Sequence, residues 1–93
     1  MPRRFSGPLE ILTPAGLPLA TAQGELVIDA LDLGLDEWEG ALRQVSPPEA
    51  AQAGGRYILR LPNGGQGEIV VSRGFSGGVW QFLGQGPPPE TPA

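Results

Sequence analysis

Arginine is the residue type through which this chain could bind an anion. The predicted strand over 56–61 places Arg56 and Arg60 on one outward face, and Arg73 closes the following strand. Guanidinium groups recognise phosphate through forked hydrogen bonds, so these three residues predict a patch for an anionic ligand or single-stranded nucleic acid. The competing interpretation is that they are surface arginines that keep a strand edge soluble.

An acidic segment is the second candidate for chemistry, because hard cations such as calcium bind carboxylate oxygens. Its spacing matches no calcium-loop pattern, and such runs usually form a solvated face. We therefore predict no metal site among its members, which are Asp29, Asp32, Asp36, Glu37 and Glu39.

The chain contains no histidine and no cysteine, which removes disulfides, thiolate chemistry and the usual near-neutral general base. None of its serines has an evident base partner, and no spacing suggests a pair of carboxylates across a cleft. The sequence therefore predicts a protein that is not an enzyme and holds no cofactor.

Six arginines and no lysine face ten acids, and the resulting net charge of −4 argues against a broad nucleic-acid surface. No apolar run approaches the roughly 18 residues of a membrane span, and the first seven residues lack the apolar stretch of a signal peptide. We expect a cytoplasmic protein with no membrane partner.

Alternating apolar residues predict strands over 9–13, 19–30 and 79–83. Segment 36–45 fits both a strand and a helical stripe. Gly40 weakens the helix, and strands are predicted on both sides, so the strand is favoured.

The clearest predicted element is a hairpin of 56–61 and 67–73, joined by a turn rich in asparagine and glycine. A slip of one residue would set Arg56 opposite Arg73, which is unfavourable. The predicted register pairs Leu59 with Ile69, Tyr57 with Val71 and Arg60 with Glu68.

These elements predict a mainly β fold, a small six-stranded barrel or sandwich with one short helix over 47–53. Two halves read alike, with 9–14 matching 58–62, 23–26 matching 66–69, and Trp38 matching Trp80. The halves would form two pseudo-repeated three-stranded meanders, although short matches also arise by chance in a chain rich in glycine and proline.

Residues 1–85 are predicted to form one domain and 86–93 a disordered proline-rich tail, whose removal should leave folding intact. The aromatic residues at alternating strand positions are predicted to be core rather than a platform for stacking bases. They are Trp38, Tyr57, Trp80 and Phe82.

Apolar residues also fall on the outer parity of the strands, where a lone monomer would normally place polar groups. They are Leu12, Val27, Ile58 and Val70. The sequence therefore predicts a non-catalytic module for protein interaction or self-assembly, a homo-oligomer or a complex with a protein partner, with Ile58 and Val70 at the interface.

Overall fold

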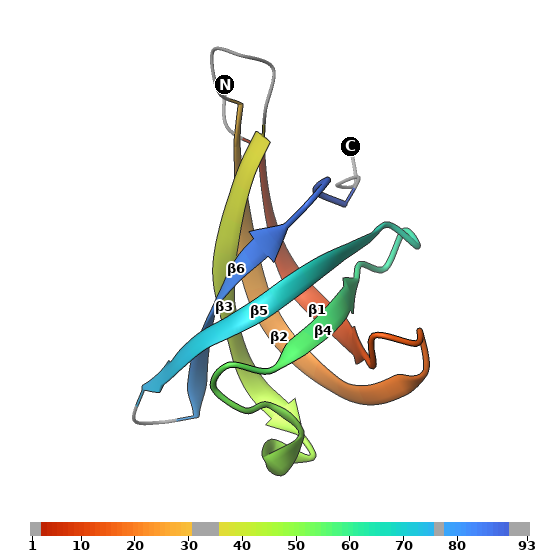
Figure 1. Cartoon of the computed structure of the whole chain (residues 1–93), viewed down its shortest axis with the longest axis vertical. Helices are drawn as coiled ribbons and strands as arrows, with labels where there is room; N and C mark the ends of the chain where they lie inside the picture. The colour runs from red at the N-terminus through yellow and green to blue at the C-terminus, as the bar shows by residue number, and fades with distance from the viewer. Residues whose placement is uncertain (1–2, 31–35, 76–77, 90–93) are drawn as a thin grey trace.

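The computed structural model describes residues 3–30, 36–75 and 78–89, which form a mainly β structure (Figure 1). Its strands are β1 (Arg3–Leu12), β2 (Pro18–Ala30), β3 (Asp36–Ser46), β4 (Arg56–Arg60), β5 (Gln66–Phe75) and β6 (Val79–Gln85).

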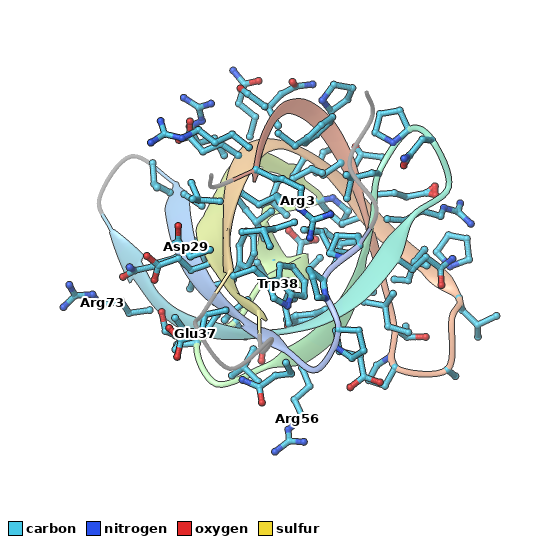
Figure 2. All side chains as sticks on the ribbon, turned by 90° about the horizontal axis from the view of Figure 1, so that it is seen from above. Arg3, Asp29, Glu37, Trp38, Arg56 and Arg73 are labelled. Atoms are coloured by element: carbon cyan, nitrogen blue, oxygen red, sulfur yellow. The ribbon has the colours of Figure 1, made fainter. Side chains whose placement is uncertain are left out.

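The strands close into a six-stranded antiparallel barrel in the order β1-β2-β3-β6-β5-β4. Seen from above, the ribbon encloses side chains such as Trp38, whereas Arg56 and Arg73 point outward (Figure 2). The predicted six-stranded barrel is thereby confirmed. Each half of the chain is a three-stranded meander, and the two meanders meet at the β3–β6 and β1–β4 pairs.

Segment 36–45 is a strand, as the alternation favoured. The predicted helix over 47–53 is wrong in extent, because only a 3-10 turn, η1 (Pro48–Ala50), forms there. Ser46 gives no side-chain cap to this turn, and Ala51 is already extended. The helical backbone therefore does not continue past a single turn.

The predicted hairpin register is wrong by two residues, because Leu59 lies opposite Gly67 and Tyr57 opposite Ile69. A shift of two keeps every side chain on its predicted face, since the side-chain period of a strand is two. Arg60 therefore lies opposite Gln66 on β5, and its ion pair is with Glu10 on β1 instead of Glu68.

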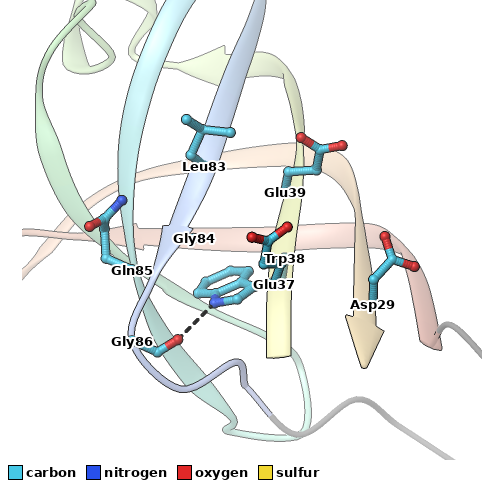
Figure 3. Close-up of a pocket in the computed structure, with 8 residues that line it drawn as sticks. All are labelled: Asp29, Glu37, Trp38, Glu39, Leu83, Gly84, Gln85 and Gly86. Carbon is cyan, nitrogen blue, oxygen red and sulfur yellow. Dashed lines mark hydrogen bonds between the residues drawn. The ribbon is translucent and has the colours of Figure 1, made fainter. Parts of the chain in front are cut away.

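Two aromatic residues pack over glycines of the neighbouring strand. The Trp38 indole covers Gly84, where a methyl group would lie 2.2 Å from Cδ2 of the ring (Figure 3). Phe82, two residues before Gly84, covers Gly40, where a methyl group would lie 2.7 Å from Cζ. Because β3 and β6 run antiparallel, the two aromatic-glycine contacts are reciprocal.

The same pairing shows which positions of the two meanders correspond. Leu26 lies opposite Gly40 between β2 and β3, and Ile69 lies opposite Gly84 between β5 and β6. This agrees with the predicted match of 23–26 to 66–69. The pairing aligns Trp38 with Phe82, however, whereas the sequence match paired Trp38 with Trp80.

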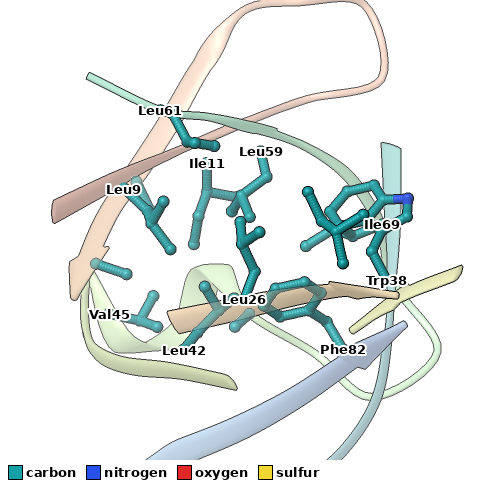
Figure 4. Close-up of a cluster of buried hydrophobic side chains, with 14 residues drawn as sticks. Leu9, Ile11, Leu26, Trp38, Leu42, Val45, Leu59, Leu61, Ile69 and Phe82 are labelled. Atoms are coloured by element: carbon teal, nitrogen blue, oxygen red, sulfur yellow. The ribbon is translucent and has the colours of Figure 1, made fainter. Parts of the chain in front are cut away.

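The core fills the barrel with apolar side chains from every strand (Figure 4). Trp38 and Phe82 are buried within it, with an edge-to-face contact at 6.1 Å between ring centroids. Tyr57 and Trp80 are half-buried and pack against it, so they flank the core instead of lying at its centre.

The segment after β6 returns to the barrel. The Trp38 indole Nε1 donates a hydrogen bond of 3.2 Å to the carbonyl of Gly86, and the Pro89 ring is fully buried. Pro89 is thus buried although it lies in the segment that the sequence predicts to be a disordered tail. Residues 90–93 of the predicted tail lie outside the described residues.

Candidate protein-interaction surface

Three apolar side chains adjoin one another on the outside of the barrel, where water or a partner must meet them. Val70 on β5 lies directly opposite Leu83 on β6, and Ile58 on β4 is its diagonal neighbour. Leu83 is 43% exposed, and the other two are half-buried. We call Ile58, Val70 and Leu83 the apolar stripe, which runs diagonally across β4, β5 and β6.

A hollow of about 300 Å³ lies beside the part of the stripe formed by Ile58 and Val70. Ile58 and Val70 line it, and Pro14, from the β1–β2 turn, forms part of its wall. Such a hollow gives an incoming apolar side chain a place to lose its hydration, as the centre of a protein interface does.

Opposite charges lie on the two sides of the apolar stripe. Arg56 is the cross-strand partner of Val70, and Glu68 is the cross-strand partner of Ile58. Both side chains are exposed, and neither forms an ion pair within the part of the chain that the structure describes. The surface therefore combines an apolar centre with a polar rim of both signs.

Neither of the other two outward apolar residues named from the sequence extends the exposed stripe. Leu12 lies directly opposite Ile58 between β1 and β4, but it is 0% exposed. Its outer parity therefore did not make it accessible. Val27 is half-buried on β2, where Glu39 lies between it and Leu83 in the register.

The three arginines of the predicted anion patch do not share one surface. Arg60 is occupied by Glu10, to which its Nη2 donates a hydrogen bond of 2.7 Å at Oε1. Arg56 and Arg73 point away from the barrel in different directions (Figure 2). Arg73 lies opposite Gln81, near the far end of β5.

We expect Arg60→Ala to lower the free energy of unfolding by less than about 1 kcal/mol, because a half-exposed ion pair is screened by solvent. A double-mutant cycle with Glu10→Gln, measured by urea unfolding, should show coupling, whereas the cycle with Glu68→Gln should show none. Coupling of Arg60 to Glu68 alone would restore the register predicted from the sequence.

The acidic segment meets the barrel at an open pocket of about 330 Å³ beside Trp38 (Figure 3). Asp29 and Glu37 are cross-strand partners at its edge, and Glu39 also lines it. Within the described residues no group of acidic side chains is arranged to hold a metal ion. Asp32 lies outside those residues.

Of the serines weighed as nucleophiles, Ser72 donates its hydroxyl hydrogen bond to the carbonyl of Gln81, at 3.1 Å. That bond is to a backbone acceptor, which is no general base. Ser76 lies outside the described residues.

Leu83 is the member of the stripe that the sequence analysis missed. Strand alternation places Trp80 and Phe82 inward and therefore Leu83 outward, so its parity was readable. The neighbour of Leu83 could not be predicted from the sequence. Its pairing with Val70 depends on a register shift in β5 between Val71 and Arg73.

No helix among the described residues is long and apolar enough to cross a membrane. Comparison of the chain with protein-family models, with curated proteins and with solved structures gives no match.

Proposed function

We propose that this chain is a non-catalytic protein-interaction module that associates with a second copy of itself through the apolar stripe. The observation that carries the proposal is the cross-strand pairing of Val70 with Leu83, which is 43% exposed, on the outside of a closed barrel. Apolar residues joined in this way, and rimmed by charge, are typical of an interface centre.

A second copy is favoured over a different partner because the surface is complementary to itself. Arg56 and Glu68 lie on opposite sides of the stripe and at similar distances along neighbouring strands. A two-fold axis running along the stripe would set Arg56 of each copy against Glu68 of the other. Two-fold interfaces require this kind of self-complementarity, and it supplies two ion pairs for one association.

Charge reversal tests this arrangement directly. Arg56→Glu should weaken the dimer at least about tenfold, because two attractive pairs become two repulsive ones, and Glu68→Arg should do the same. The double variant exchanges the two charges and should recover most of the affinity. The dissociation constant is measured by sedimentation equilibrium.

Controls separate the interface from net charge. Arg4→Glu and Glu25→Arg make the same charge changes at exposed positions of β1 and β2, away from the stripe, and should leave the dimer intact. Leu83→Asp should dissociate it while the circular dichroism spectrum stays unchanged. A double variant as weak as either single one would overturn the two-fold arrangement.

A further inference from the structure

The Trp38 indole is held flat against backbone at one end of the barrel. A methyl group on Gly84 would lie 2.2 Å from the indole Cδ2, where the two rings are fused, and one on Gly67 would lie 2.7 Å from Cη2, at the outer edge of the six-membered ring. Because β5 and β6 are neighbouring strands, the indole lies across both, and glycine at each position leaves room for the ring. We call Trp38, Gly67 and Gly84 the tryptophan slot.

The chain's own segment 86–89 occupies this slot through two contacts. The carbonyl of Gly86 accepts the indole N–H hydrogen bond at 3.2 Å (Figure 3). Three residues later, Pro89 is fully buried, and its Cδ lies 2.9 Å from the point that a Gly67 methyl group would take. The indole edge and the proline ring therefore meet over the same glycine.

These contacts use the chemistry by which proteins recognise proline-rich peptides. A polyproline segment repeats every three residues, holds its shape without internal hydrogen bonds, and loses little conformational entropy on docking. Aromatic grooves bind it by covering a proline ring. Here Pro87, Pro88 and Pro89 constrain the backbone between the bound carbonyl and the buried ring.

We propose that the tryptophan slot is a binding site for a proline-rich peptide segment, filled in cis by residues 86–89, and that it accepts the same segment from a second copy in trans. The same contacts hold the segment whether it comes from the same chain or from a second copy. The attached tail has an effective concentration on the order of millimolar, and a segment from a second copy must compete with it for the slot. The slot faces the barrel interior, so this proposal does not depend on the apolar stripe.

The test uses the full-length chain carrying Trp80→Phe, in which Trp38 is the only tryptophan and can be excited selectively. Pro89→Asp should release the tail, because a carboxylate cannot be buried there without a partner. A synthetic peptide of residues 86–93 should then bind saturably and change the Trp38 emission. The chain with its native tail should bind the peptide at least about tenfold more weakly, because its slot is occupied.

Pro87→Asp is the matched control, since Pro87 is exposed and its replacement should leave the tail docked. A peptide carrying Pro89→Asp should not bind any of the chains. If Pro89→Asp prevents folding, Pro89→Ser removes the ring without adding charge and takes its place. Absence of saturable binding by the folded variant, or equal binding by Pro87→Asp and Pro89→Asp, would overturn the proposal.

Failure of this site is distinguishable from failure of the dimer. If the dimer forms through the apolar stripe, Pro89→Asp leaves its dissociation constant unchanged. If it forms by exchange of tails between copies, Pro89→Asp abolishes it, and Arg56→Glu has no effect.

Discussion

Gly84→Ala should lower the free energy of unfolding by about 3 kcal/mol or more, although it adds a single methyl group. That methyl group would lie 2.2 Å from Cδ2 and Cε2 of Trp38, where no atom fits. Either the buried indole or strand β6 must move, and tightly packed interiors tolerate such overpacking poorly. Urea unfolding followed by circular dichroism measures the loss.

Gly16→Ala is the comparison in which replacing glycine strains the backbone but meets no neighbouring atom. Gly16 has φ +87 and open space around it, so its replacement should cost about 1 kcal/mol through backbone strain alone. Trp38→Leu should reduce the cost of Gly84→Ala, because a smaller side chain leaves room for the methyl group. If Gly84→Ala lowers the free energy of unfolding equally in the wild-type chain and in Trp38→Leu, the Trp38 indole does not pack against Gly84.

Trp38→Ala should cost about 3 to 5 kcal/mol, a large share of the stability of a small domain. Trp38 is 4% exposed, contacts Phe82 edge to face and holds the carbonyl of Gly86. Trp80→Ala, at a position that the sequence predicts to be core, should cost about 1 to 3 kcal/mol because Trp80 is half-buried.

The loss of stability should be larger for Trp38→Ala than for Trp80→Ala. Thermal unfolding by calorimetry ranks the variants without any assumption about denaturant. A larger loss for Trp80→Ala than for Trp38→Ala would contradict the burial of Trp38 in the core.

The strands were predictable because burial on one face imposes a period of two that short segments already display. The register of β4 and β5 was not, because a shift of two residues leaves every face unchanged. The predicted pairing of Arg60 with Glu68 is wrong, because the partner of Arg60 is Glu10 in β1, fifty positions away in the chain. Rules for pairing within one hairpin cannot predict a partner on a different strand pair.

The candidate surfaces were predictable in part. The outward parity of Ile58 and Val70 follows from that of Leu59, but the pairing of Val70 with Leu83 requires the register between β5 and β6. The burial of Pro89 was hidden for another reason. Composition marks 86–93 as polar and proline-rich, and only the placement of Trp38 beside Gly67 creates a site for the ring.

The solution mass of the unmodified chain tests the proposed self-association most directly. Light scattering across a dilution series should give a mass that rises from that of one 9.7 kDa chain toward twice that value between about 1 and several hundred micromolar. A mass of 9.7 kDa at every concentration in that range would contradict the proposal.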